Sequence, residues 1–498
     1  MKKKIFIILL LLVSVVLIGC GESTTNKTTN KPTIPVQTTK EITTIKEVTT
    51  TKPTTRITTI PTTTTEEEIT TRTTFSDEIL NYRNSKLNSI PTQMKLELQK
   101  DFKFFWEKAN KDKSSSGYGL IPDYYDVINR RSGACSIASV GFGLSMIPVG
   151  VEYGWITEEE GRERVYGTLN TMWNLKNIHG FYYHFLNMIT GARDGNCEVS
   201  IIDTALMICG ILTAGKYFGG EIYDLACDIY ERVEWNWYYN ESTYRFYMGY
   251  NPDSKKFAGA WDYMAEQLMI YFLAAGSPTY PVDAKAYKRM CITTIPKKVE
   301  KTSEYDAFYP TWIGSMFAYQ FSHAWVDFRN IIDENGINWF DNSVNATKAS
   351  ISYAKQLSAE WEAINEKSYG NSATLGPNGY KGSYGIRPCI SNENLVDGTM
   401  VIHGSLASIV FTPNEAKEAA KYLYNVPNLW DSDWGFIDSY NLGTLTDDYE
   451  WYCPNIYGLN KGITGLMIEN YVSNMIWNIF MSIPYVQTGL TELGFSEV

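Results

Sequence analysis

One segment constrains the fold of this chain more than any other. Residues 198–218 read "EVSIIDTALMICGILTAGKYF", with apolar residues at helical spacing and further apolar residues on both flanks. A helix that is apolar on nearly every side is a buried helix. Because an ionised carboxylate without partners costs several kcal/mol to bury, Glu198 and Asp203 must each be paired in the interior or open onto a cleft.

Helical patterns recur about a dozen times between residues 76 and 498, and strand-like alternation is scarce. One of these patterns begins with Thr157 and Glu160 in the register of a capping box. Amphipathic segments alternate with nearly all-apolar ones, which is what two concentric rings of helices require. We therefore predict an all-α fold of the α/α toroid type, with long polar and aromatic loops gathered at one mouth, where chemistry is expected.

The N-terminal part of the chain has a different composition. Residues 1–20, "MKKKIFIILLLLVSVVLIGC", resemble a bacterial lipoprotein signal peptide in which Cys20 is lipidated, the alternative being an uncleaved membrane anchor. Residues 21–75 are rich in threonine and lack the aromatic residues of a core, so we predict a disordered tether. We therefore expect residues 76–498 to form one domain, held at the extracellular side of the cell membrane by the lipid anchor alone.

Charge and composition narrow the class of partner. The net charge of −11 and the absence of a basic block argue against nucleic acid. Fourteen tryptophans and thirty-five tyrosines favour a surface that stacks on flat, polar ligands. The cysteines show no CxxC spacing and the four histidines no metal-binding motif, so we expect buried thiols, no metal and no cofactor. We expect a monomer.

Ten blocks of the sequence occur in an order that resembles a known family. They include "GLIPDYYD", "HGFYYHFLNMITGAR", "EVSIIDTALMICGILTA", "FSHAWVDFR", "DGTMVIHGSLASIVFTPNEA" and "WGFIDSYN", and they extend from about Leu98 to Phe495. The chain resembles the putative-glucoamylase family, which includes the endo-β-1,2-glucanases of glycoside hydrolase family 144. The resemblance implies an (α/α)6 barrel and hydrolysis of a β-glucan, with β-1,2-glucan as the expected substrate.

Glycoside hydrolysis needs one protonated carboxyl group and one ionised carboxylate. We predict Glu198 as the general acid, at the start of the apolar helix, although a helix N-terminus favours the ionised form. Asp203 lies five residues later, about 140° around the helix. It therefore cannot share the face of Glu198, and we interpret it as a structural acid bonded to a neighbouring helix.

Loops supply the other acids. We predict Asp397 in "LVDGTMV" as the general base, while "DG" is also a turn signal in its own right. Asp123 and Asp126 in "IPDYYD" are alternatives for the base, and both are predicted to bind substrate.

A third group of candidates lies in "SHAWVDFR", which we predict to be a helix. His323 and Asp327 would share one face beside Trp325, as in a sugar subsite, or form a buried structural pair. Arg193 in "TGAR" is a further candidate for substrate binding or structure, and Glu266 in "AEQLMIYF" is interpreted as structural.

Two rivals to a glucanase stay open. A transglycosylase on the same glucan would use the same acid with a different second carboxylate. A carbohydrate-binding surface lipoprotein would keep the aromatic loops without catalysis.

Overall fold

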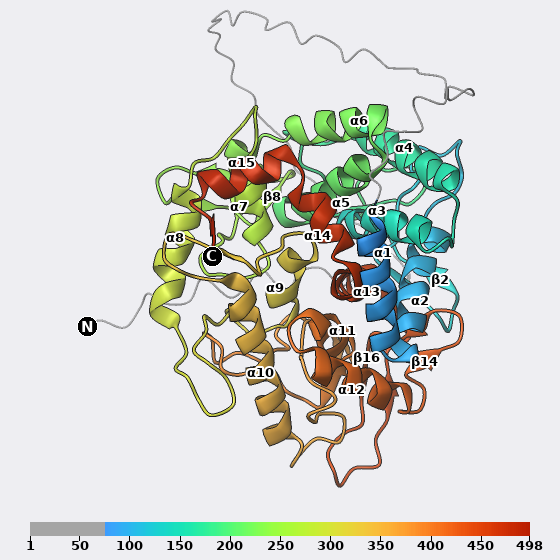
Figure 1. The fold of residues 1–498 in the computed structure, drawn as a ribbon, viewed down its shortest axis with the longest axis vertical. Helices are drawn as coiled ribbons and strands as arrows, with labels where there is room; N and C mark the ends of the chain where they lie inside the picture. The colour runs from blue at the N-terminus through green and yellow to red at the C-terminus, as the bar shows by residue number, and fades with distance from the viewer. Residues whose placement is uncertain (1–74) are drawn as a thin grey trace, which may run out of the picture. The chain divides into compact units, whose positions relative to one another are not determined.

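The structure of the protein is a computed structural model, in which residues 75–498 are described (Figure 1). The predicted signal peptide, Cys20 and the tether up to Thr74 lie outside the described residues.

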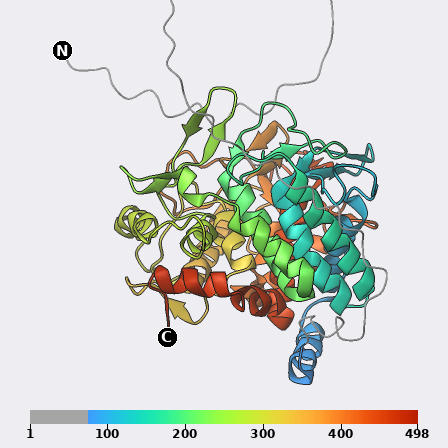
Figure 2. The same cartoon turned by 90° about the horizontal axis from the view of Figure 1, so that it is seen from above.

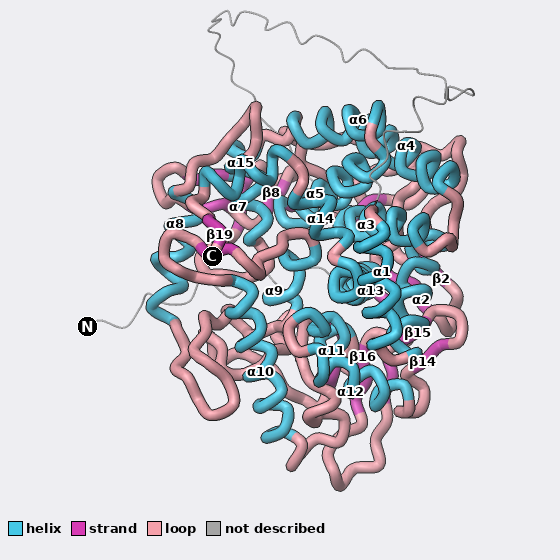
Figure 3. The backbone as a smooth tube through the Cα atoms, viewed as in Figure 1, coloured by secondary structure: helices cyan, strands magenta, loops and turns pink. Residues whose placement is uncertain are grey.

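The described part of the chain is mostly helical, as predicted (Figure 3). Thr157 accepts a hydrogen bond from the backbone of Glu160, whose side chain accepts one from the backbone of Thr157, so the predicted capping box is confirmed. The α-helices are α1 (Asp77–Ser89), α2 (Thr92–Lys108), α3 (Ile137–Glu152), α4 (Glu158–Asn174), α5 (Ile201–Phe218), α6 (Gly220–Glu231), α7 (Leu268–Ala275), α8 (Lys285–Thr294), α9 (Phe317–Gln320), α10 (Trp339–Leu357), α11 (His403–Leu406), α12 (Pro413–Tyr424), α13 (Gly458–Ser473), α14 (Met475–Met481) and α15 (Pro484–Glu492). Short 3-10 helices are η2 (Trp235–Tyr238), η3 (Ile295–Lys297), η4 (Phe321–Ala324) and η5 (Ala407–Val410).

The helices differ in how deeply they are buried. Almost every residue of α3, α5, α7 and α13 is buried, whereas α2, α4, α6 and α12 each bury one face and expose the other. Helix α3 packs against α5, α13, α2 and α4, and α5 packs against α6 (Figure 2). The all-apolar segments are therefore core helices, and the amphipathic segments cover them.

Glycines set the closest helix crossing. A side chain at Gly210 of α5 would collide with the backbone of Gly141 in α3, and one at Gly141 would collide with the Leu206 carbonyl. The backbones of α3 and α5 can touch here because both residues at the contact are glycines, which have no side chain. This close contact helps to fix the position of α5. By length and apolar composition α5 could cross a membrane, but 89% of it is buried within the fold, so we interpret it as a core helix.

Short antiparallel strands brace the loops between these helices, which the sequence did not predict. Each has two or three residues, and those of residues 75–498 form eight small sheets. The three-stranded sheets are β18 (Asn455–Tyr457), β1 (Tyr124–Asp126) and β2 (Arg131–Ser132); β5 (Val199–Ser200), β8 (Gly249–Asn251) and β9 (Lys256–Ala258); and β13 (Thr399–Val401), β16 (Ser439–Asn441) and β17 (Trp451–Tyr452). The two-stranded sheets pair β3 (Cys135–Ser136) with β4 (Phe185–Leu186), β6 (Tyr239–Asn240) with β7 (Arg245–Phe246), β10 (Ile331–Ile332) with β19 (Ser496–Glu497), β11 (Thr374–Gly376) with β12 (Gly379–Lys381), and β14 (Trp430–Asp431) with β15 (Gly435–Phe436).

Candidate active site

Three acidic residues each stand directly before one of these strands. Asp123 precedes β1, Glu198 precedes β5 and Asp438 precedes β16. A strand held in a sheet fixes the backbone of the residue that leads into it, so each carboxylate begins from a braced position.

A histidine lies between two of the acids at the start of α5. His184 Nδ1 lies 2.9 Å from Glu198 Oε1, and Nε2 lies 3.5 Å from Asp203 Oδ1. Its ring stacks on Phe185, with the ring centroids 3.9 Å apart. Burial acts to lower the pKa of His184, but Asp203 and then Glu198 outweigh it and raise the pKa to about 9. The imidazole is therefore a cation at neutral pH.

Glu198 is not in the helix, which begins only at Ile201 after the N-cap Ser200. Burial acts to raise its pKa, yet the hydrogen bond and charge of His184 prevail and lower it below the usual value. A lowered pKa disfavours the protonated form that a general acid needs, so the electrostatics of the resting site do not favour Glu198 in that role, which stays a prediction.

Asp203 also differs from its prediction. It lies in the first turn of α5, where Ser200 Oγ donates to its Oδ2 at 2.5 Å. Because Glu198 precedes the helix, the angle of about 140° between the two residues does not apply. Both carboxylates face the same His184 ring, and within residues 75–498 the Asp203 carboxylate contacts His184 and Ser200 rather than a neighbouring helix.

Asp123 is a carboxylate with a raised pKa. Burial, opposed by His184 and reinforced by Asp203 and Asp438, raises the pKa of Asp123 to about 6. The residue is half-buried, and within residues 75–498 no side chain or backbone group donates a hydrogen bond to its carboxylate. Asp123 therefore keeps a carboxylate free to meet a ligand.

Two further acids complete the group, and the sequence analysis undervalued one and missed the other. Burial and the nearby Asp203 raise the pKa of Glu266 to about 7. Burial raises the pKa of Asp438 to about 6, although Thr374 and Asn460 both donate hydrogen bonds to it. Asp438 lies in the block "WGFIDSYN", and the only signal there was an acid among apolar and aromatic residues.

The hydroxyl of Tyr380 lies within the electrostatic reach of four of these acids. Tyr380 is in β12, and 50% of its surface is exposed. Its pKa is raised to about 12 by burial of the hydroxyl and then by four carboxylates, Asp123, Asp438, Glu266 and Asp203. The hydroxyl thus points inward while the residue remains half exposed. We call Asp123, Glu198, Asp203, Glu266 and Asp438 the carboxyl cluster.

Asp397, the predicted base, is not brought to the carboxyl cluster. Its Oδ2 accepts a hydrogen bond from the Tyr384 hydroxyl at 2.7 Å, and its Oδ1 accepts from the Thr399 backbone at 3.0 Å. The Ile402 amide donates to the Asp438 carbonyl across the antiparallel pair of β13 and β16. Asp397 lies five residues before Ile402, on the other side of β13 from it. It closes the turn before β13, as its "DG" signal also allowed.

Two other predicted residues hold loops in place. Asp126 accepts hydrogen bonds from the backbones of Ile128 and Asn129 at 3.0 and 2.9 Å, so it anchors a turn rather than joining the cluster. Arg193 donates to Asp253 at 2.9 Å and to the Cys197 carbonyl at 2.8 Å. Its charge also helps to lower the pKa of Glu198.

The predicted helix and sugar subsite in "SHAWVDFR" are wrong. Helix η4 ends at Ala324, so His323 and Asp327 share no helical face. His323 is 2% exposed, and burial lowers its pKa to about 3. Trp325 is fully buried and donates from Nε1 to Ser145, while Asp327 pairs with Arg329 at 2.7 Å. The aromatic residues that suggested a subsite belong to the core.

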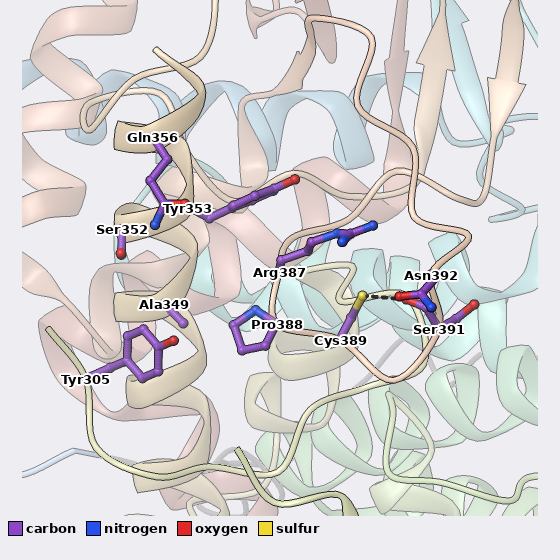
Figure 4. Close-up of a pocket in the computed structure, with 10 residues that line it drawn as sticks. All are labelled: Tyr305, Ala349, Ser352, Tyr353, Gln356, Arg387, Pro388, Cys389, Ser391 and Asn392. Atoms are coloured by element: carbon purple, nitrogen blue, oxygen red, sulfur yellow. Dashed lines mark hydrogen bonds between the residues drawn. The ribbon is translucent and has the colours of Figure 1, made fainter. Parts of the chain in front are cut away.

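A cavity of about 380 Å³ lies elsewhere, between α10 and residues 387–392 (Figure 4). It is lined by two tyrosines, an arginine and several uncharged side chains, but by no carboxyl group. It therefore cannot supply acid–base chemistry by itself. Within residues 75–498, no group of three or more His, Cys, Asp and Glu is arranged to hold a metal ion.

The fold and the carboxyl cluster define a mostly helical protein with an acidic site beneath a tyrosine. The sequence profile of a family described as putative glucoamylase matches residues 258–484. The chain is 27% identical over 438 residues to an exo β-1,2-glucooligosaccharide sophorohydrolase of Parabacteroides distasonis, a match that covers 79% of this chain. It spans only 56% of that relative's length.

Solved structures also resemble this chain in fold. A putative glucoamylase from Bacteroides caccae has a TM-score of 0.70 at 25% identity, covering 82% of this chain and 99% of its own. An endo-β-1,2-glucanase from Chitinophaga pinensis, solved with sophorotriose and glucose, has a TM-score of 0.72 at 23% identity, covering 83% and 99%. The similarity to the putative-glucoamylase family that the sequence predicted is confirmed.

Proposed function

We propose that this chain is a glycoside hydrolase that cleaves β-1,2-glucan within the chain, as an endo-β-1,2-glucanase. The observation that carries the proposal is the carboxyl cluster, four of whose five members act on the Tyr380 hydroxyl and whose pKa values are shifted in opposite directions at Glu266 and Glu198. Two acids with separated pKa values are what glycoside hydrolysis requires. The similarity to β-1,2-glucan hydrolases supports the substrate class.

We assign Glu266 as the general acid. Its pKa of about 7 is the highest among the shifted carboxyl groups of the cluster, so it holds a proton near neutral pH. In the reaction Glu266 transfers that proton to the glycosidic oxygen as the bond from the anomeric carbon to that oxygen breaks. The half-buried position of Glu266 permits contact with a ligand.

We assign Asp123 as the general base. With a pKa of about 6 it is ionised just below neutral pH, and its carboxylate has no internal hydrogen bond within the described residues. Asp123 takes a proton from the water whose oxygen forms the new bond to the anomeric carbon. His184 neutralises part of the surrounding negative charge and keeps Glu198 ionised.

Three wider proposals accompany this assignment. The buried helices α3, α5, α7 and α13 belong to the inner ring of an (α/α)6 barrel, and α2, α4, α6 and α12 to its outer ring. The chain is lipidated at Cys20 and acts as a monomer at the extracellular side of the membrane. Incorporation of labelled fatty acid into the full chain, lost in Cys20→Ala, tests the anchor.

The experiment for the activity uses β-1,2-glucan and two isosteric variants. Glu266→Gln and Asp123→Asn should each lower kcat by about a hundredfold or more, the scale of a positioned acid or base. Asp397→Asn, the matched control at a turn, should keep near-normal kcat. An aryl glycoside whose leaving group needs no proton should restore turnover in Glu266→Gln but not in Asp123→Asn.

The outcomes separate the rival functions. Restored turnover in Glu198→Gln instead of Glu266→Gln would return the acid role to Glu198. Products longer than the substrate would indicate a transglycosylase. A wild-type protein that binds β-1,2-glucan and releases no product would be a binding protein, and the hydrolase proposal would be refuted.

A further inference from the structure

One tryptophan differs from all the others in its exposure. All fourteen tryptophans lie within residues 75–498, and thirteen of them are buried or half-buried. Trp312 is 48% exposed, in the loop that precedes α9. A large apolar ring left in water adds nothing to the core, and such rings commonly mark ligand or partner contacts.

Trp312 stacks on a residue that leads into the candidate active site. The rings of Trp312 and Tyr263 are stacked, with centroids 5.5 Å apart and planes inclined by 30°. Because one face of the indole packs on Tyr263 and the side chain is still half exposed, the opposite face is open.

Tyr263 and Glu266 belong to one tight turn before α7. The buried side chain of Gln267 closes this turn, since its Nε2 donates to the Tyr263 carbonyl at 2.7 Å and its Oε1 accepts from the Ala265 backbone at 2.8 Å. The stacked pair is therefore fixed to the segment that carries the proposed general acid.

The backbone on the other side of the pair is equally well held. The Trp312 carbonyl accepts a hydrogen bond from the Ser391 amide at 2.8 Å, and the Thr311 amide donates to the Tyr319 hydroxyl at 2.7 Å. Ser391 also lines the cavity of Figure 4, so the stacked pair of Trp312 and Tyr263, which we call the platform, lies beside that cavity. The held backbone and the stack on Tyr263 together keep the indole in place before a ligand arrives, which lowers the entropy cost of binding.

The chemistry of the platform selects a neutral ligand. Within residues 75–498, no lysine or arginine lies over the ring of Trp312 or Tyr263, and the nearby carboxyl cluster repels anions. A pyranose ring offers an apolar face of C–H groups to an aromatic ring and keeps its hydroxyl groups in water.

We propose that Trp312, supported by Tyr263, is a stacking subsite for a glucose unit of the substrate chain outside the bond that is cleaved. The inference rests on the proposed function, because it takes β-1,2-glucan as the ligand. It adds a requirement for chain length: an oligosaccharide long enough to cover Trp312 gains its contact, and a shorter one does not.

The test compares Trp312→Ala with Tyr82→Ala, a matched control that removes another exposed ring, 41% exposed on α1. β-1,2-Gluco-oligosaccharides of increasing length are supplied, and kcat and KM are measured for each. For the longer chains Trp312→Ala should raise KM about fivefold to tenfold with kcat nearly unchanged, the scale of one aromatic stacking contact. Trp312→Phe should recover part of the loss.

Each outcome has one meaning. Equal KM values for Trp312→Ala and Tyr82→Ala on long chains would overturn the subsite, and so would an equal loss on the shortest cleaved substrate. A wild-type protein that cleaves no chain of any length would refute the hydrolase proposal instead. In that case calorimetric titration of long oligosaccharides into wild type and Trp312→Ala still decides the subsite, because unchanged affinity in the variant overturns it.

Discussion

The charge of His184 should make a measurable, pH-dependent contribution to stability. Its pKa rises from an unfolded value of 6.5 to about 9 in the fold. A shift of that size corresponds to about 3 kcal/mol of preference for the cationic form. Because 28% of the side chain is exposed, solvent screening reduces this to about 2 kcal/mol.

The pH dependence has a definite direction. Below pH 6.5 both folded and unfolded chains carry the histidine proton, so the stabilisation is fully present. Between pH 6.5 and 9 the unfolded chain has released the proton and the folded protein has not, so the stabilisation declines as the pH rises. Above pH 9 the imidazole is neutral in both states and the contribution is lost.

The assay is urea denaturation of wild type and His184→Gln at pH 6, 7.5 and 9.5. The difference in the free energy of unfolding should be about 2 kcal/mol larger at pH 6 than at pH 9.5. His179→Asn is the control, because the pair of His179 with Glu234 lies at the surface, with 42% and 33% exposure. A difference for His184→Gln that is constant across this range would refute the electrostatic reasoning.

Two other predictions concern catalysis and packing. The rate on β-1,2-glucan should rise as Asp123 ionises near pH 6 and fall as Glu266 loses its proton near pH 7, giving a narrow bell in kcat/KM; a rate that stays level to pH 9 would exclude Glu266 as the acid. Gly210→Ala should lower the free energy of unfolding by about 1–3 kcal/mol, because the new methyl group meets the Gly141 backbone and α3 must shift; an unchanged urea midpoint would contradict the crossing.

The helices were readable from the sequence because their signals are local. The capping box at Thr157 and the all-apolar run through α5 each depend on residues within a few positions of one another. The strands were not predicted for the opposite reason. Two or three residues are too few to show a repeating hydrophobic pattern, and β5 forms only because it pairs with β8 about fifty residues away. Glu198 was therefore placed in the helix, when in fact it precedes a strand.

The site was only partly predictable. The loop acids Asp123 and Glu198 were found, but Asp438 was missed, because its place beside β16 depends on the pairing of that strand with β13. Glu266 was interpreted as structural, whereas it lies in the turn before α7, which begins two residues later at Leu268. Which acid is protonated depends on burial and on distances between loops, and neither can be read from residue types.

The charge of His184 helps to explain how five acids can share one site. If all five were ionised, one histidine would face five negative charges in a partly buried space, which is a large unfavourable term. His184 contacts Glu198 and Asp203 directly, and this contact lowers the pKa of Glu198. The acids that lack this contact have raised pKa values: the charge of His184 partly offsets the rise at Asp123, that of Lys461 partly offsets the rise at Asp438, and the pKa is highest at Glu266, where neither acts. Nearby cations thus help to set which of these acids hold a proton. Replacing His184 should consequently alter the pH dependence of catalysis as well as stability, by moving Glu198 and Asp123 toward protonation and shifting the acidic limb of the bell to higher pH.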